Sequence, residues 1–154
     1  MADEFEQFKQ NSNIVVRGLN INGDPKTNLI NMITSGLGIH VTERDIKFLI
    51  KLTLKNEREG TTSVKVALFD QRLRDEIYAS RLKLKGFNVY IGEDLTQKKS
   101  TLAYEARQYA KSTENATTWS TDGTIFQKDS ADAKPCAIHN KADLKPEDPN
   151  RAQK

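Results

Sequence analysis

The chain has 154 residues, of which 36% are hydrophobic and 29% charged, and its formal net charge is +3. This balance is typical of a globular protein and excludes the disordered and membrane classes. The apolar runs fall far short of the ~20 residues of a membrane span, and the acidic start lacks the apolar core of a signal peptide. We therefore expect no membrane partner.

The first predicted elements are a strand and a helix. Residues 1–12 are expected to form a flexible lead-in. The strand covers residues 13–19, with Ile14 and Val16 facing one way and Val15 and Arg17 the other. A helix then begins with Asp24 as its N-cap and Pro25 in its first turn, and it ends at the glycines of residues 36–38.

Two more strands, a second helix and a fourth strand follow. The strands are predicted at residues 45–53 and 63–68, on either side of a polar loop at 55–60. The helix covers residues 70–85 because Leu73, Ile77, Ser80 and Leu84 fall on one face. The last strand is predicted at residues 88–91.

This order of elements predicts the fold class. Strand, helix, strand, strand, helix, strand is the split βαβ pattern of a ferredoxin-like or RRM-like α+β domain, with a four-stranded antiparallel sheet and both helices on one face. We assign it to residues 13–93. The other face of such a sheet is available for a ligand.

The pattern changes in the remainder of the chain. Thr96 is the predicted cap of a third helix that extends to about Ser112. Asp122-Gly123 predicts the turn of a hairpin over residues 117–126, and Ala137-Ile138 a further short strand. We therefore expect a small helix-and-hairpin domain over residues 94–144, with a disordered tail at 145–154.

Positive charge is concentrated in two segments of the chain. Residues 71–86 carry five cations against two acids, and residues 97–112 carry four against one. Such clusters suit a phosphate-binding surface, although solvated helix faces have the same composition. On the predicted sheet, Arg17, Lys51 and Lys65 are expected to point outward together. They would suit a phosphate backbone or serve only solubility.

Aromatic stacking on the sheet is not predicted for the inner strands. RRM-like sheets usually stack bases on aromatic residues of strands one and three. The outward positions here are Val15, Ser63, Lys65 and Ala67, and none is aromatic. Tyr90 and Tyr104 could stack on a base, but the sequence does not distinguish them.

Sequence motifs of enzymes are missing. The chain has no GxSxG, no HExxH and no phosphate-cradling glycine loop. Cys136 and His139 are expected on opposite faces of an extended segment. We therefore predict no enzyme, catalytic residue, metal site, cofactor or small-molecule substrate. Because Cys136 is the single cysteine, an intramolecular disulfide is excluded, which favours the cytosol or the nucleus.

A series of short segments, in order, resembles a known family. They are Arg74-Asp-Glu-Ile77, Ala79-Ser-Arg-Leu-Lys-Leu-Lys-Gly86, Glu93-Asp-Leu-Thr96, Glu105-Ala-Arg107, Trp119, Asp122-Gly-Thr-Ile-Phe126, Lys134-Pro135 and Asp143-Leu144. Together they look like the nucleic-acid chaperone encoded by the first open reading frame of LINE-type retrotransposons, and like the C-terminal domain of the baculovirus few-polyhedra (FP) protein. The similarity covers about residues 13–144.

The resemblance implies a function. It implies an RRM-like domain and a C-terminal domain that together clamp single-stranded RNA or DNA, package RNA into a ribonucleoprotein and anneal strands. Lys51 stands where the family usually has an arginine, Arg81 and Arg107 match basic family positions, and Lys128 stands near a usual hairpin arginine. Lysine lacks the forked contact of arginine, so we expect weaker and more salt-sensitive binding.

Relatives also differ from this chain in one respect. They carry a coiled coil before the RRM-like domain and assemble as trimers, whereas twelve residues precede the first strand here. Self-association is therefore left open.

The sequence thus predicts sequence-tolerant binding of single-stranded RNA or DNA. The expected binding residues are Arg17, Lys51, Lys65, Arg81, Lys85, Arg107 and Lys128. The alternative is a protein-interaction module, viral or domesticated, that keeps the fold and has lost nucleic-acid binding.

Overall fold

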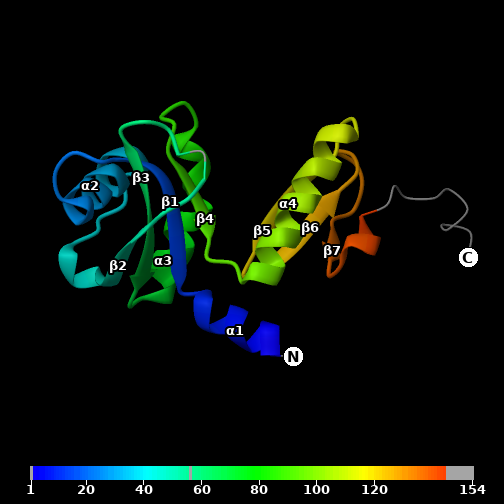
Figure 1. Ribbon diagram of the computed structural model, residues 1–154, viewed down its shortest axis with the longest axis horizontal. Coiled ribbons are helices and arrows are strands. Elements are labelled where there is room, and N and C mark those ends of the chain that lie inside the picture. The colour runs from blue at the N-terminus through cyan, green and yellow to red at the C-terminus, as the bar shows by residue number, and fades with distance from the viewer. Residues whose placement is uncertain (1, 56, 145–154) are drawn as a thin grey trace, which may run out of the picture. The chain divides into compact units, whose positions relative to one another are not determined.

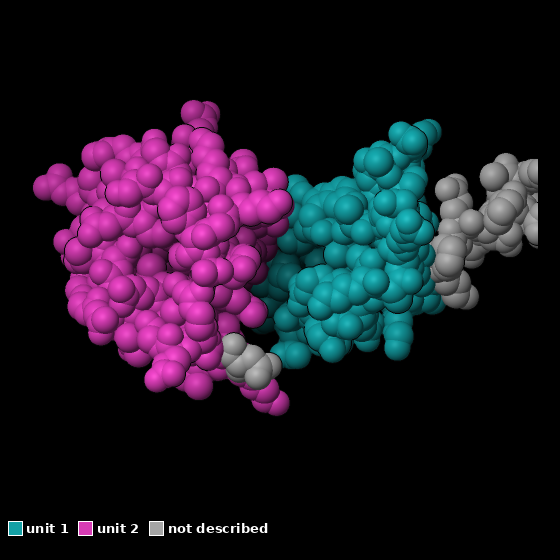
Figure 2. Space-filling model, turned by 90° about the horizontal axis from the view of Figure 1, so that it is seen from above, with its two compact units in different colours: residues 1–8, 95–154 teal, residues 9–94 magenta. Residues whose placement is uncertain are grey.

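The computed structural model describes residues 2–55 and 57–144 of the chain. It divides into two compact units, residues 9–94 and residues 1–8 with 95–154 (Figure 2). The division after residue 94 falls one residue beyond the end of the predicted first domain. The first eight residues belong with the C-terminal unit and not with a separate lead-in.

A four-stranded antiparallel sheet forms the centre of the unit of residues 9–94 (Figure 1). Its strands lie in the order β2-β3-β1-β4, and every neighbouring pair is antiparallel. The α+β class is therefore confirmed. The strands are β1 (Asn13–Asn20), β2 (Ile46–Leu52), β3 (Thr61–Leu68) and β4 (Tyr90–Glu93).

Two helical segments cover one face of this sheet. They are α2 (Pro25–Met32), which continues as a π-helical turn at Ile33–Leu37, and α3 (Gln71–Ala79), which precedes a 3₁₀ turn at Arg81–Leu84. A further 3₁₀ turn, Glu43–Asp45, leads into β2. The core between helices and sheet contains buried Ile14, Val16, Val64, Leu29 and Ile77. Their period of two along the strands follows from the pleat.

The helix ends agree with the predicted caps, with one change in length. The Asp24 side chain accepts a hydrogen bond from the Thr27 N–H, and Gly38 ends the first helical segment in the left-handed region. The second helix is shorter than predicted because the α-helix ends at Ala79. Its tighter 3₁₀ continuation still places Leu84 in the core at 2% exposure.

The unit of residues 1–8 and 95–154 contains the start of an N-terminal helix, a longer helix and a three-stranded sheet. Its elements after residue 94 are α4 (Gln97–Ser112), β5 (Thr117–Thr121), β6 (Thr124–Lys128), β7 (Cys136–Ile138) and a 3₁₀ turn at Lys141–Asp143. The Thr96 hydroxyl caps α4, and the β5–β6 turn has Asp122 and Gly123 at positive φ, as a two-residue hairpin turn requires. Leu102, Ala106, Ile125 and Ile138 are among its core residues.

The prediction of a flexible lead-in is wrong for residues 2–10, which form helix α1 (Ala2–Gln10). Gln7 is 2% exposed, and its side-chain oxygen accepts a hydrogen bond from the Thr96 N–H at 2.9 Å. Lys99 and Glu4 form an ion pair at 2.8 Å. These polar contacts have no hydrophobic period, which is why the sequence pattern did not reveal the helix.

The predicted tail at 145–154 lies outside the described residues. Within the described part of the chain, no helix is both long enough and apolar enough to cross a membrane.

Candidate functional site

The sheet of residues 9–94 has a second face on which neither α2 nor α3 packs, called the outer face below. Residues opposite each other on neighbouring strands point to the same side of a sheet. Val15 lies opposite Lys65 and Gly92, and Arg17 lies opposite Tyr90. These positions alternate with the buried core positions Ile14 and Val16, so they belong to the outer face.

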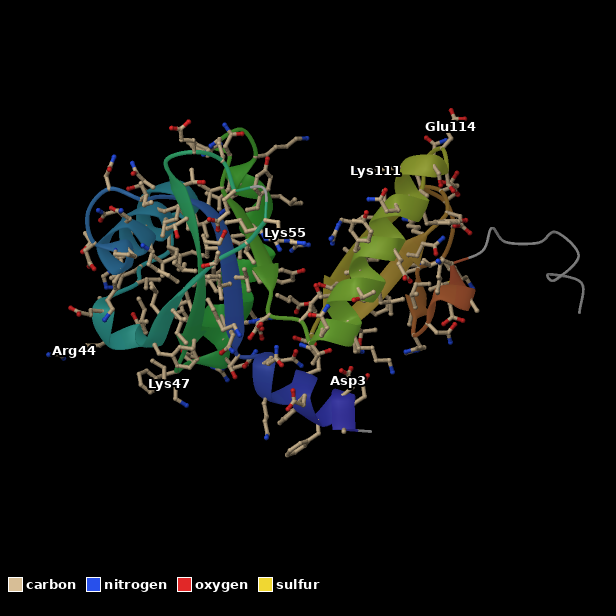
Figure 3. The ribbon with its side chains drawn as sticks, viewed as in Figure 1. Asp3, Arg44, Lys47, Lys55, Lys111 and Glu114 are labelled. Atoms are coloured by element: carbon tan, nitrogen blue, oxygen red, sulfur yellow. The ribbon has the colours of Figure 1, made fainter. Side chains whose placement is uncertain are left out.

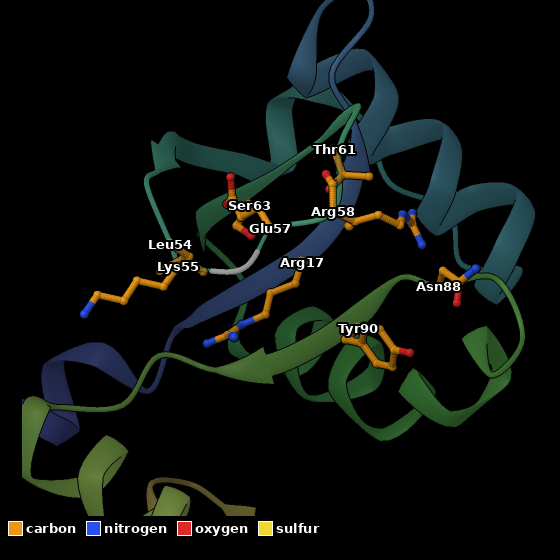
Figure 4. A pocket seen from close by; sticks show the side chains of 10 residues that line it. Arg17, Leu54, Lys55, Glu57, Arg58, Thr61, Ser63, Asn88 and Tyr90 are labelled. Atoms are coloured by element: carbon orange, nitrogen blue, oxygen red, sulfur yellow. The ribbon is translucent and has the colours of Figure 1, made fainter.

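A cavity of about 190 Å³ lies at one corner of the outer face (Figure 4). It is bounded by β1, the beginning of β3, the loop that follows β2, and the segment that enters β4. The lining residues are Arg17, Gly18, Leu54, Lys55, Glu57, Arg58, Thr61, Ser63, Asn88 and Tyr90.

A close approach of two backbone segments forms one wall of the cavity. Gly18 has a φ of +87°, and a Cβ at this position would lie 2.3 Å from the carbonyl oxygen of Asn88. Asn88 itself has a φ of 58°. Only glycine is compatible with both the conformation and the contact, so this residue fixes the distance between β1 and the entry to β4.

Three cations surround the cavity against one carboxylate, that of Glu57. In the described part of the chain, Arg17, Lys55 and Arg58 make no side-chain ion pair. The backbone of Arg58 is held because its carbonyl accepts hydrogen bonds from the Thr61 hydroxyl at 2.6 Å and the Thr61 N–H at 3.1 Å. A cation that is already in an ion pair must give up that partner when it binds an anion, so these three are better placed to form charge-assisted hydrogen bonds with one.

Aromatic side chains reach the outer face from the two edge strands. Tyr90 on β4 is 66% exposed and lines the cavity. Phe48 on β2 is 39% exposed and lies opposite Ala67. The inner-strand positions are not aromatic, as the sequence indicates, and exposed rings lie instead on the outer strands.

Of the predicted binding residues, Arg17 lines the cavity. Lys65 also lies on the outer face, where it forms an ion pair with Asp94. The Lys65 ammonium is 3.4 Å from the Asp94 carboxylate, and its side chain is 30% exposed. A phosphate would therefore have to compete with Asp94 for this lysine.

The prediction that Lys51 points outward with Arg17 and Lys65 is wrong. Lys51 lies opposite Val64, a core residue, and so belongs to the helix side of the edge strand. The pairing of β2 with β3 has an irregularity between Ile46 and Phe48. Such an irregularity reverses the alternation that follows it, which turns Lys51 inward and Phe48 outward.

Two other predicted residues, Arg81 and Lys85, follow α3 and do not line the cavity. The Arg81 guanidinium lies 4.0 Å from the centre of the Tyr78 ring and donates a hydrogen bond to the Tyr78 carbonyl at 3.0 Å. It thus packs on its own helix. Lys85 is exposed at the end of the 3₁₀ turn.

The remaining predicted residues, Arg107 and Lys128, belong to the other unit. Arg107 is exposed on α4, and Lys128 is half-buried at the end of β6, opposite Thr117. The seven predicted cations therefore do not form one cluster within either unit.

The sequence did not identify Lys55, Arg58, Ser63 or Tyr90 as site residues. Residues 55–60 were identified only as a polar loop, because charged loops are common and carry no periodic signal. The alternation of β3 does place Ser63 on the outer face. The cavity itself depends on the positive φ of Gly18, which a sequence pattern does not give.

Neither the models of known protein families nor the curated proteins compared with this sequence gave a match.

Proposed function

We propose that residues 9–94 form an RRM-like domain that binds single-stranded RNA or DNA, without strong sequence preference, at the cavity of the outer face. The strand order β2-β3-β1-β4 and the two helices on one face support the RRM-like assignment. The observation that carries the function is the set of three cations, none in an ion pair with another described residue, around a cavity that Tyr90 also lines.

Cations and an exposed ring are the two elements that single-strand binding requires. Phosphates supply most of the affinity through released counterions, and a base stacked on an aromatic ring contributes about 1–3 kcal/mol without selecting a sequence. A duplex keeps its bases stacked inside, so the Tyr90 contact favours single strands. Assembly into a retroelement-type ribonucleoprotein, with strand annealing, is proposed on the family resemblance.

The test is a fluorescence anisotropy titration of the full chain with labelled single-stranded RNA and DNA over a series of salt concentrations. The triple variant Arg17→Ala, Lys55→Ala, Arg58→Ala removes the cations of the cavity. Since each phosphate contact on a single strand contributes about 0.7 to the slope of log K against log salt, the slope should become shallower by about 2.

The matched control is the triple variant Arg44→Ala, Lys47→Ala, Lys51→Ala. It removes the same charge from exposed positions, and Arg44 and Lys47 lie at the other end of β2 from Lys55 (Figure 3). It should leave the slope unchanged. Equal losses in both variants would mean that only net charge matters and would refute the cavity as the binding site.

A protein-interaction module is the second candidate, and exposed apolar side chains favour it. Phe69, Leu82 and Phe87, on loops and turns of the same unit, are 65–75% exposed. If the unmodified chain shows no salt-dependent binding to either oligonucleotide, this candidate replaces the first.

A further inference from the structure

Ser63 is a buried polar side chain on the wall of the cavity. The residue is 2% exposed, and it lines the cavity. Among residues 2–55 and 57–144, none forms a hydrogen bond with its hydroxyl. The buried side-chain polar atoms that lack a partner in this part of the chain are on Asp3 and Gln127, so the Ser63 oxygen is reachable from the cavity. A hydroxyl that faces a cavity can exchange a hydrogen bond to water for one to a ligand.

The size of the cavity limits what the ligand can be. A volume of about 190 Å³ corresponds to about six waters at ~30 Å³ each. It is smaller than the ~300–1,000 Å³ of a pocket for a drug-sized molecule. The cavity therefore accommodates a single planar ring system, and not two successive nucleotides.

The cations lie on two sides of this space. Figure 4 shows the Arg17 and Lys55 side chains extending to one side of the cavity and the Arg58 side chain to the other, toward Asn88. A terminal phosphate would need its cations together. Cations on both sides instead match a nucleotide inside a strand, which has one phosphate before it and one after it.

We infer that the cavity binds one internal nucleotide of the strand, with its base between Tyr90 and Ser63 and its two flanking phosphates at the separated cations. This inference rests on the proposed function and adds to it a discrete anchor point. A hydroxyl both donates and accepts hydrogen bonds, so Ser63 can bond to the edge of any base. The anchor is therefore specific for a nucleotide and tolerant of sequence.

The first test compares small probes by NMR on the full chain. Thymidine 3′,5′-bisphosphate, thymidine 5′-monophosphate, thymidine and inorganic phosphate are titrated separately, and the amide shifts of Gly18, Ser63 and Tyr90 are followed. The bisphosphate should bind most tightly and shift these three amides. If inorganic phosphate shifts them at the same concentration, the cavity holds a phosphate alone and the inference fails. Shifts confined to other residues also overturn it.

The second test isolates the hydroxyl. Ser63→Thr and Ser63→Val add nearly the same volume, and both residues suit a strand, but only threonine keeps the hydroxyl. The valine variant should bind single-stranded DNA roughly 2- to 12-fold more weakly than the threonine variant, the range of one net hydrogen bond. The salt slopes of the two should be equal because no charge changes.

The outcomes separate this inference from the proposed function. Equal affinities of the two variants, with unchanged unfolding midpoints and normal salt-dependent binding, overturn the nucleotide anchor and leave strand binding intact. Loss of salt-dependent binding in the unmodified chain overturns both.

Discussion

Gly18 is the residue on which the shape of the cavity depends most directly. Replacing it by alanine imposes an unfavourable φ and places a Cβ 2.3 Å from the Asn88 carbonyl oxygen. Where the backbone conformation suits alanine, replacing glycine by alanine stabilises a protein by up to about 1 kcal/mol, and where it does not, the loss is larger than that. We therefore expect Gly18→Ala to lower the free energy of unfolding by more than about 1 kcal/mol. Urea titration of the full chain measures this change.

A second glycine provides the matched control. Gly92 lies on β4 and also belongs to the outer face, but a Cβ there meets nothing within 4 Å. Gly92→Ala should therefore leave stability unchanged or raise it by up to about 1 kcal/mol. Equal destabilisation by both substitutions would show that the Asn88 contact is not the cause.

Arg74 is one of the five cations in residues 71–86, which the sequence predicts to suit a phosphate-binding surface. The structure places it at 1% exposure, with its guanidinium 2.9 Å from the fully buried Glu93 carboxylate. Removing one partner of a buried pair typically costs about 3–5 kcal/mol. We expect Glu93→Gln to cost about 3 kcal/mol, near the lower limit, because Asp75 also contacts Arg74, at 3.2 Å.

Two comparisons test the origin of this cost. Glu76→Gln removes an exposed carboxylate from α3, the helix that also carries Arg74, and should change the free energy of unfolding by less than about 0.5 kcal/mol. The double variant Arg74→Met, Glu93→Leu should recover much of the lost stability, because it removes both buried charges. A double variant as unstable as Glu93→Gln would contradict this account. Denaturant unfolding of the three variants provides the measurement.

At the scale of elements, helix α1 is held in part by an ion pair, Glu4 with Lys99, that depends on pH. The hydrogen bond and charge of Lys99 lower the pKa of Glu4 below its ordinary value of 4.5. A carboxylate with a lowered pKa in the folded state stabilises the fold above its unfolded pKa. That contribution is lost as the pH falls through the folded pKa.

Lys99→Met should therefore lower the free energy of unfolding most at neutral pH. The difference in unfolding free energy between this variant and the unmodified chain should narrow below pH 4.5. The pH-dependent part should stay below about 1 kcal/mol, because the Glu4 side chain is 68% exposed. Unfolding free energies measured between neutral and acidic pH test this. The exposed neighbour variant Lys98→Met should show a gap that does not change with pH.

The elements that the sequence predicted well are those with a local cause. The Asp24 cap, the Asp122-Gly123 turn and the alternation of Val64 and Val66 each depend on residues close together in the chain. The errors have non-local causes. The orientation of Lys51 depends on how β2 pairs with β3, and α1 depends on Thr96 and Lys99, about ninety residues away.

The candidate site was predictable only in part, for the same reason. Arg17 was identified because it alternates with core residues on β1. Lys55 and Arg58 come from a loop whose position depends on the hydrogen bonds that the Thr61 hydroxyl and N–H donate to the Arg58 carbonyl. The partner of Lys65 was also missed, because Asp94 lies almost thirty residues away in the chain. Charge counts thus located basic segments, but they did not distinguish paired cations from those without a partner.

On the scale of the whole molecule, each compact unit has its own hydrophobic core. The larger core lies in residues 9–94 and extends over all four strands of its sheet, whereas the core of the other unit consists of a few residues of α4, β6 and β7. That other unit also includes the start of α1, where Gln7 bonds to the cap of α4. The cavity and its three cations belong entirely to the unit of residues 9–94.

This division predicts how a fragment behaves. Residues 9–94 alone should unfold cooperatively in urea, because their core is complete, and should bind single-stranded DNA at the cavity. If Arg107 and Lys128 also contact phosphates, the fragment loses two contacts, and its salt slope is shallower than that of the full chain by about 1.4, at ~0.7 for each phosphate. The double variant Arg107→Ala, Lys128→Ala of the full chain must then reproduce the fragment's slope. Identical slopes for the fragment, the variant and the full chain would limit binding to residues 9–94 and would show that Arg107 and Lys128 do not contact phosphates.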